Sequence, residues 1–200
     1  MRIIQSIEAL EELYEPAVQT SLDKVASEIT PLYRKWIEAS RFVILSTVGP
    51  EGTDASPRGG DCPVVSIENS TELILPDWRG NNRLDSLRNI VRDKRVSLMF
   101  MVPGSNNVVR INGEAVVTDE PSIVARFEKA GKFPRSVIIV RVVEIYFQCA
   151  KALMRSKLWS SEDESAGLPT AGDFIKQFNK EFAARAYDEN YAENAKSRMW

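Results

Sequence analysis

The sequence predicts a mainly β protein of the α+β class, in which antiparallel strands close on themselves and helices flank them. Three observations predict this fold. Runs rich in Val, Ile and Phe recur between residues 41 and 150. Short polar turns separate most of these runs, whereas parallel strands would need long crossovers. Stretches with helical spacing of apolar residues lie before and after this region.

The first 40 residues are expected to be helical. The segment 6–14, SIEALEELY, carries apolar residues at helical spacing, and the segment 20–29 continues the pattern. Thr30 followed by Pro31 is typical of an N-cap with proline at the first helical position. A further helix is therefore expected to begin there.

Five or six strands are expected in the middle of the chain. Turns such as GPEGTD and PGSN separate them, and glycine, proline and asparagine favour such turns. The five or six strands are expected among seven candidate segments, 41–49, 54–58, 63–67, 72–76, 95–102, 107–118 and 136–150.

Two helices are expected between the strands and one after them. The segment 81–93 has an apolar face and asparagine available as an N-cap, and 120–131 begins with proline and ends at glycine. The segment 160–172 is expected to be a loop and 173–199 one amphipathic helix. The residues expected on the apolar face of 81–93 are Leu84, Leu87, Ile90 and Val91.

The composition limits the class of protein. Two hundred residues, 44% hydrophobic and 27% charged, are typical of one soluble globular domain with appended helices. The 26 basic and 28 acidic residues are interspersed, so no nucleic-acid partner is expected. No stretch approaches the ~20 apolar residues of a membrane span, and the first residues lack the pattern of a signal peptide. We therefore expect a cytoplasmic protein that does not associate with membranes.

The chain contains no histidine. This absence excludes Ser-His-Asp and Cys-His triads, HExxH zinc sites and the usual near-neutral general base. The two cysteines show no paired metal spacing, and no metal site is expected. If the protein is an enzyme, a bound cofactor that carries the chemistry is the simplest solution.

The segment 73–89, LILPDWRGNNRLDSLRN, is a candidate anion site. A strand ends at Pro76 and a helix begins near residues 81–83, and unpaired N–H groups at the start of a helix favour an anion. Arg79 and Arg83 flank this position, and the planar guanidinium suits a phosphate. The alternative is an ordinary capped helix with solvated arginines.

The segment 54–61, DASPRGGD, is the second candidate. In an extended segment Ser56 and Arg58 lie on the same face, and the two glycines that follow permit a bend or a close backbone approach. The alternative is a surface turn in which Arg58 pairs with Asp54 or Asp61.

Together these segments resemble the flavin-binding split β-barrel of the pyridoxamine 5′-phosphate oxidase-like proteins. The resemblance covers about residues 40–148, and QCAKALMRSKLW resembles a subgroup of FMN-dependent enzymes. It implies a six-stranded antiparallel split β-barrel over 41–148, with helical extensions at 1–40 and 149–200, the latter packing on the barrel or on a partner subunit. It further implies a homodimer with FMN at the subunit interface. The matching segments, in family order, are FVILSTVGPEG, DASPRG, ELILPD, GNNRLDSLRNIVRDKRVSLMFMVPG and VVRINGEAVVT.

The resemblance assigns three groups of residues to the cofactor: a ligand-facing strand, a strand end beside the isoalloxazine, and a phosphate-binding turn. The sequence departs from the family in two places: Asn-Asn-Arg replaces a common Ser-Arg-Lys run, and GGDCP replaces a smooth strand continuation. The loss of one cation shifts the phosphate towards Arg58 and the helix N-terminus. In the order of the three groups, the residues are Ser56 and Arg58; Leu75, Pro76 and Asp77; and Asn81, Asn82 and Arg83.

Lys151 and Arg155 are a separate candidate pair. They lie four residues apart and so share one face of a helix. They could contact the flavin phosphate, its ring or an anionic substrate, or they could form a solvated basic face. Both readings stay open on the sequence alone.

The function that follows from the resemblance is that of an FMN-dependent oxidoreductase acting on a small molecule by hydride transfer. No catalytic acid or base is nominated. The alternatives are a flavin carrier or sensor without turnover, or a deazaflavin-dependent reductase on the same barrel. Haem is disfavoured without histidine. Pyridoxine phosphate oxidation is not expected, because the family's oxidase carries a late arginine-histidine pair for its substrate.

Overall fold

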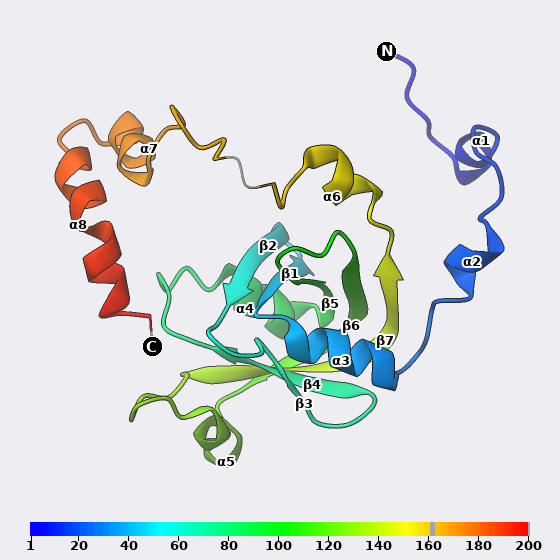
Figure 1. Cartoon of the computed structure of the whole chain (residues 1–200), viewed down its shortest axis with the longest axis horizontal. Helices are drawn as coiled ribbons and strands as arrows, with labels where there is room; N and C mark the ends of the chain where they lie inside the picture. The colour runs from blue at the N-terminus through cyan, green and yellow to red at the C-terminus, as the bar shows by residue number, and fades with distance from the viewer. Residues whose placement is uncertain (161–162, 200) are drawn as a thin grey trace.

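The computed structural model describes residues 1–160 and 163–199 (Figure 1). Its centre is one seven-stranded antiparallel sheet of order β2-β1-β5-β6-β7-β4-β3. The strands are β1 (Phe42–Gly49), β2 (Gly52–Gly59), β3 (Ser66–Ile67), β4 (Glu72–Asp77), β5 (Arg95–Met101), β6 (Val108–Thr118) and β7 (Ser136–Gln148). The helices are α1 (Ile7–Glu11), α2 (Gln19–Leu22), α3 (Pro31–Ala39), α4 (Asp85–Arg92), α5 (Pro121–Val124), α6 (Lys151–Ser156), α7 (Ala171–Phe178) and α8 (Ala184–Lys196).

The mainly antiparallel α+β class is confirmed, but the six-strand count and the closure of the sheet are not. The seventh strand is β3, which has two residues and pairs only with β4 in the described part of the chain. The sheet also stays open, because no pairing joins β2 to β3 among the described residues. Its two edges therefore lie on β2 and β3.

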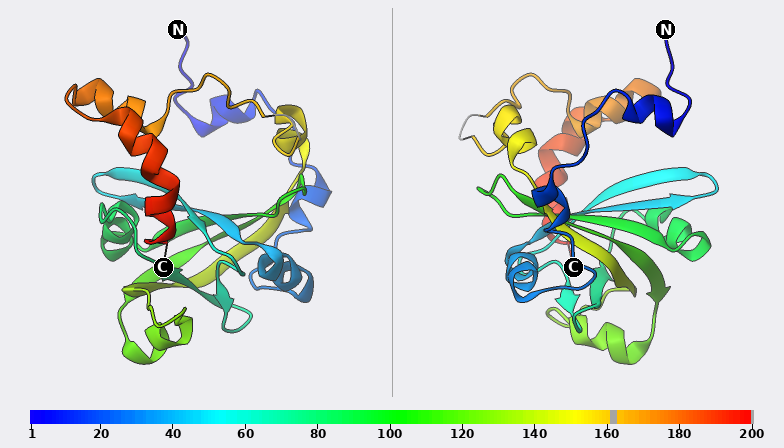
Figure 2. Two further views of the ribbon diagram at one scale, coloured as in Figure 1. Left: turned by 60° about the vertical axis from the view of Figure 1, so that its left-hand side comes forward. Right: turned by 90° about the vertical axis from the view of Figure 1, so that its right-hand side faces the viewer.

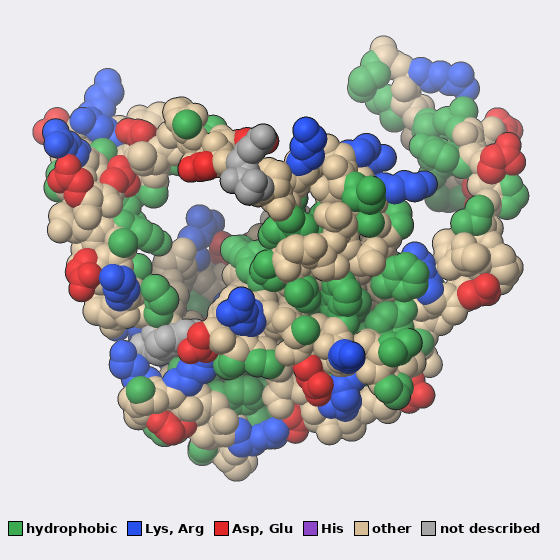
Figure 3. Space-filling model, in the orientation of Figure 1, with side chains coloured by type: hydrophobic (Ala, Val, Ile, Leu, Met, Phe, Trp, Pro, Cys, Tyr) green, Lys and Arg blue, Asp and Glu red, His purple; other side chains and the backbone are tan. Residues whose placement is uncertain are grey.

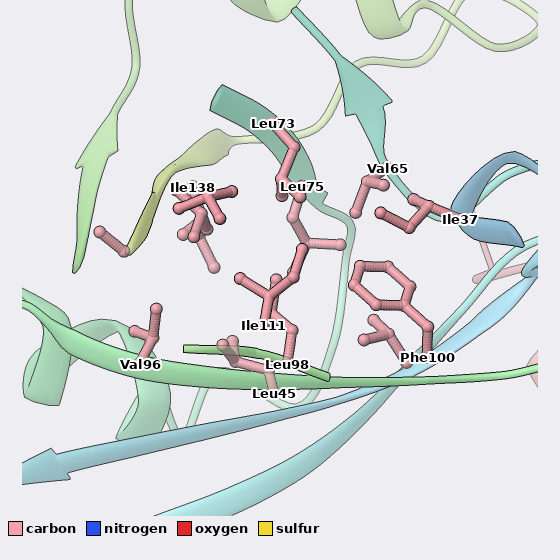
Figure 4. Packing of buried hydrophobic residues seen from close by; sticks show 14 of the residues in the cluster. Ile37, Leu45, Val65, Leu73, Leu75, Val96, Leu98, Phe100, Ile111 and Ile138 are labelled. Carbon is pink, nitrogen blue, oxygen red and sulfur yellow. The ribbon is translucent and has the colours of Figure 1, made fainter. Parts of the chain in front are cut away.

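Strands β6 and β7 bend the sheet around the core. They pair along nearly their whole lengths, with a register shift between Asn112 and Gly113. β5 pairs with the first half of β6, whereas β4 pairs with the first half of β7. The two halves of the sheet thus face each other across buried side chains (Figure 4). The largest of these include Phe100, Leu45, Leu98, Ile111, Ile138 and Leu75.

Helix α3 covers one end of this core. Thr30 caps it as expected, because its hydroxyl oxygen accepts a hydrogen bond from the Tyr33 amide at 3.5 Å. Ile37 is completely buried in the core cluster. The buried Ser40 hydroxyl donates to the Met101 carbonyl at 2.8 Å and so ties the end of the helix to β5.

The buried face predicted for α4 is partly wrong. Ile90 is buried, but Leu84 and Val91 are 45% and 75% exposed. The helix instead buries Ser86 and Asn89, whose polar groups find hydrogen-bond partners on β2 and β1. The expected asparagine cap is also wrong, because Leu84 occupies the N-cap position without a side-chain hydrogen bond.

The other helical predictions also need correction. The single helix expected over 173–199 is interrupted between α7 and α8, and the helix expected over 120–131 is reduced to α5 and a short 3-10 turn, Ala125–Phe127. In the first 30 residues, α1 and α2 are only five and four residues long. Residues 161–162 of the expected loop lie outside the described residues. None of the described helices has the length and apolar character needed to cross a membrane.

Helices α7 and α8 form an arm beside the sheet (Figures 1 and 2). The Asp188 carboxylate joins them by accepting hydrogen bonds from the Thr170 hydroxyl at 2.6 Å and the Gly172 amide at 2.9 Å. In the space-filling view, hydrophobic side chains of this arm lie among charged and other polar ones (Figure 3). The exposed hydrophobic residues of the two helices include Phe174, Phe178, Tyr187 and Tyr191.

Candidate functional site

Two adjoining cavities lie where β2, β4 and the segment before α4 meet. The first has a volume of about 660 Å³, and we call it the arginine cavity because Arg58, Arg79, Arg83 and Arg135 line it. The second has a volume of about 930 Å³, and we call it the loop cavity because residues 57–66 form much of its wall. The residues common to both walls are Pro57, Arg58, Trp78, Arg79 and Gly80.

Arg58 joins the two sides of the open sheet. Its Nη1 lies 2.7 Å from Oδ1 of Asp77, so the ion pair connects β2 with β4. The two side chains are only 25% and 15% exposed. The partner is therefore Asp77, and the pairing with Asp54 or Asp61 considered from the sequence is wrong. The Nε group of Arg58 is buried and has no hydrogen-bond partner among the described residues.

Asp54 connects β2 with α4. Its Oδ2 accepts hydrogen bonds from the Ser56 hydroxyl at 2.9 Å and from the Ser86 hydroxyl at 2.5 Å. Ser86 is 3% exposed. Ser56 and Arg58 both line the arginine cavity, in agreement with the prediction that they lie on one face of the strand, and the Ser56 hydroxyl donates a hydrogen bond to Asp54.

The turn before α4 is shaped by its asparagines. The Asn81 side-chain oxygen accepts a hydrogen bond from the Arg83 amide at 3.1 Å, which is a typical asparagine turn. Asn82 and Leu84 have φ angles of 61° and 63°, in the left-handed region that is uncommon for a leucine. The Arg83 guanidinium pairs with Asp85 at 2.9 Å. The turn thus presents side chains to the cavity from a constrained backbone.

The structure brings most of the predicted site residues together. Two of the three assigned groups meet at the arginine cavity, and the strand-end residues Leu75 and Pro76 line the loop cavity. The predicted residues on the wall of the arginine cavity are Ser56, Arg58, Asp77, Asn81, Asn82 and Arg83.

Lys151 and Arg155 lie elsewhere. They share helix α6, as their spacing predicted, but within the described residues neither side chain lines either cavity. The indole N–H of Trp159, just after this helix, donates to the Ser105 carbonyl at 2.7 Å. The segment is thereby fixed to the turn between β5 and β6.

Sequence reasoning missed several contributors to the cavities, among them Arg135 and Lys129. Arg135 precedes β7 and donates to the Asn82 side-chain oxygen at 3.4 Å. Lys129 forms an ion pair with Asp61 at the loop cavity, and its Nζ lies 5.6 Å from the centre of the Trp78 ring. Both come from loops remote in sequence, and no local pattern identifies them.

Ion pairs set the charge of the loop cavity's rim. The Arg126 guanidinium donates to both carboxylate oxygens of Glu68, at 2.8 and 2.6 Å. These hydrogen bonds lower the pKa of Glu68 below its ordinary value. The hydrogen bond from Lys129 likewise lowers the pKa of Asp61. Among the described residues no group of three or more acidic or cysteine side chains could hold a metal ion.

Arg126→Gln should raise the pKa of Glu68 towards the ordinary value of 4.5, which NMR titration of the side-chain carboxyl would measure. Because the folded-state pKa is lowered, the pair stabilises the protein above the unfolded-state pKa and loses this effect as pH falls through the folded-state value. The expected stability difference at neutral pH is at most about 1 kcal/mol, since Arg126 is partly exposed. Equal Glu68 pKa values in both proteins would contradict the assignment, and Arg34→Gln, which alters a surface pair elsewhere, is the control.

Comparison with known proteins identifies the fold. The family model described as pyridoxamine 5′-phosphate oxidase matches residues 29–149. A variant of HupZ from Group A Streptococcus has a TM-score of 0.50 and 16% identity, covering 60% of this chain and 99% of that chain. A protein related to general stress protein 26, from Clostridium acetobutylicum and of the pyridoxinephosphate oxidase family, has a TM-score of 0.43 and 8% identity, covering 57% and 84%.

An F420 reductase has a TM-score of 0.40 and 16% identity, covering 57% of this chain and 94% of that chain. Of these three structures, the HupZ variant reaches a TM-score of 0.50, and at 16% identity it shows likeness of fold alone. No curated protein matches the chain. The family model, in contrast, matches more than half of the residues, from the segment before α3 to the end of β7. The chain therefore belongs to the pyridoxamine 5′-phosphate oxidase family of split-barrel proteins.

Proposed function

We propose that this protein binds FMN across the two cavities and is an FMN-dependent oxidoreductase acting on a small molecule. The observation that carries the proposal is the pair of adjoining cavities that share Arg58, Trp78 and Arg79. Four arginines line the arginine cavity, and the loop cavity combines Arg126 and Lys129 with apolar side chains that include Val64 and Leu75. The two cavities together offer the cations and the apolar surface that a phosphate joined to a flat aromatic ring system requires.

The phosphate end of FMN is assigned to the arginine cavity. Arginine binds phosphate through paired N–H donors, and the start of α4 adds backbone N–H groups. The buried Nε of Arg58 has no acceptor in the described part of the chain, and because Arg58 lies on the walls of both cavities, it supports a ligand oxygen where the two cavities adjoin. An N–H donor buried without an acceptor is costly, and a cofactor oxygen would relieve that cost.

The ring end is assigned to the loop cavity. Leu75 and Pro76 form its wall at the end of β4, and Trp78 adds an aromatic surface. These residues bind and orient the ring and exclude water from it. The flavin itself supplies hydride transfer when it is bound. The Asp61–Lys129 pair adds a charged group to the wall of the same cavity.

A homodimer is part of the proposal. It is supported by the exposed hydrophobic side chains on the α7–α8 arm, which a second copy of the chain would cover. The deazaflavin alternative has less support. A deazaflavin needs further basic residues for its anionic tail, and the candidates Lys151 and Arg155 line neither cavity in the described structure. Pyridoxine phosphate oxidation remains unexpected in a chain without histidine.

The test is an absorption spectrum of the purified protein from about 300 to 550 nm, before and after addition of FMN. Two flavin bands that survive gel filtration are expected. A protein that takes up no FMN would overturn the proposal, and a single band near ~400 nm would indicate haem or a deazaflavin instead. A photoreduced flavin that is reoxidised by none of the candidate acceptors would favour a carrier over an enzyme.

A further inference from the structure

The four arginines of the arginine cavity differ in whether an acidic partner neutralises them. Arg58 pairs with Asp77 at 2.7 Å, and Arg83 pairs with Asp85 at 2.9 Å. An arginine held by a carboxylate has already used part of its charge and its donors. The family resemblance assigns both arginines to the phosphate. The Arg58–Asp77 pair is only 25% and 15% exposed and leaves Arg58 little free charge, whereas the Arg83–Asp85 pair is 76% and 44% exposed and is weakened by water.

Arg79 and Arg135, in contrast, have no acidic partner among the described residues. Within residues 1–160 and 163–199, Arg79 has no ion-pair or hydrogen-bond partner, and Arg135 contacts only the Asn82 side-chain oxygen, at 3.4 Å. That oxygen belongs to a neutral amide, so it leaves the charge of Arg135 uncompensated. Both side chains are exposed on the wall of the cavity.

The sheet register explains why these two residues lie together. β4 and β7 are antiparallel neighbours, and Asp77 is paired with Ser136 at the end of the ladder. Arg79 follows the end of β4, and Arg135 directly precedes the start of β7. Both therefore leave the sheet at the same end, above the same cavity.

The net charge of the arginine cavity depends on Arg79 and Arg135. Its wall contains four arginines and three carboxylates, those of Asp54, Asp77 and Asp85. The difference is one positive charge, and removing both Arg79 and Arg135 would leave one negative charge. A phosphate monoester carries nearly two negative charges at neutral pH and would then be repelled.

We propose that Arg79 and Arg135 bind the phosphate of the cofactor, whereas Arg58 and Arg83 hold the walls of the cavity in place. The inference rests on the proposed flavin binding and names the residues that distinguish FMN from a flavin without phosphate. Arg58 fixes β2 against β4, and Arg83 fixes the turn before α4. The phosphate then lies between two guanidinium groups that come from different loops.

The test compares FMN with riboflavin, which has the same ring but no phosphate. Dissociation constants for both are measured by flavin fluorescence quenching with the full chain and with Arg79→Gln, Arg135→Gln and the double variant. Each single change should weaken FMN binding about tenfold or more, because each removes charge-assisted hydrogen bonds to the phosphate. Riboflavin binding should stay within about twofold, which also shows that the variants are folded.

Arg88→Gln is the matched control. Arg88 is an exposed arginine of α4 that lines neither cavity among the described residues, so its loss should leave both constants unchanged. If Arg79→Gln and Arg135→Gln bind FMN as tightly as the unaltered protein, the inference is overturned and flavin binding stands. If they weaken both ligands equally, they act on the fold, and the inference is again wrong. If the unaltered protein binds neither ligand, the proposed function fails as well.

Discussion

Phe100→Ala is expected to lower the free energy of unfolding by about 4 kcal/mol. Phe100 lies in the middle of the sheet and is 0% exposed, and its cross-strand neighbours are Val43 on β1 and Val109 on β6. Figure 4 shows its ring directed toward the side chains of Ile37 and Val65. Alanine would leave a cavity, because α3 and the two halves of the sheet cannot all move inward to fill it. Urea unfolding followed by far-UV circular dichroism measures the loss.

Val91→Ala is the control for this measurement. Val91 is 75% exposed on α4, so its truncation should change stability by no more than about 0.5 kcal/mol. The control also tests the orientation of the helix, because the apolar pattern placed Val91 on the buried face. A cost below about 1 kcal/mol for Phe100→Ala would show that the core does not close over this ring.

Gly113→Ala is expected to destabilise the protein by about 3 kcal/mol, although it adds a single methyl group. A Cβ at this position would lie 2.2 Å from the backbone carbonyl oxygen of Arg141. That carbonyl belongs to β7, which pairs with β6 on either side of the irregular register at residues 112 and 113. The clash therefore cannot be relieved by rotating a side chain, and the ladder itself must move. The midpoint of urea unfolding reports the effect.

Gly80→Ala provides the matched comparison. A Cβ at Gly80 meets no atom within 4 Å, and a change within about 0.5 kcal/mol is expected. If the two alanine variants prove equally stable, the close approach of β6 and β7 at the register shift between Asn112 and Gly113 is not present in solution.

Strand β1 shows what local pattern can predict. The segment 41–49 was identified by its β-branched and aromatic residues, and the strand spans Phe42–Gly49. Val43, Leu45 and Thr47 are buried in alternation with less buried neighbours, as a strand with one face on a core requires. The signal is contained within the strand itself, and long-range contacts are not needed to find it.

Helix α4 shows where the same reasoning fails. Its buried face was assigned from apolar residues, but Asn89 is buried because its side-chain N–H donates to the Thr47 hydroxyl at 3.2 Å. Gly49 contributes by leaving room for that asparagine, since a Cβ there would lie 2.3 Å from its Oδ1. Burial of a polar side chain depends on a partner that lies 42 residues away in the chain, and helical periodicity carries no information about it.

The tail helix fails for a related reason. Apolar residues at helical spacing continue through 173–199, so no local signal marks the break between α7 and α8. The break exists because the two helices pack on each other, with Gly172 allowing close approach to Asp188 and to the Ala184 carbonyl. A contact across a turn thus overrides the periodicity.

Local sequence patterns predict one part of the candidate site, and tertiary contacts determine the other part. The positions of Ser56 and Arg58 on one face of β2 and the turn at 81–83 follow from local geometry. The pairing of Arg58 with Asp77 spans 19 residues and the contact of Arg135 with Asn82 spans 53. Which arginines keep free charge is therefore decided by tertiary contacts that no segment of the sequence contains.

The two open edges of the sheet bear on how the protein resists aggregation. An unpaired strand edge is a template for another chain, and proline interrupts that template because it has no N–H to offer. Pro57 lies within the edge strand β2, and Pro76 lies in β4 beyond the two residues that β3 covers. Each edge thus carries an interruption to intermolecular strand pairing, and at both edges the proline also lies in the wall of the loop cavity. The two prolines on the wall of the loop cavity are therefore also expected to disfavour edge-to-edge pairing of the sheet with another chain.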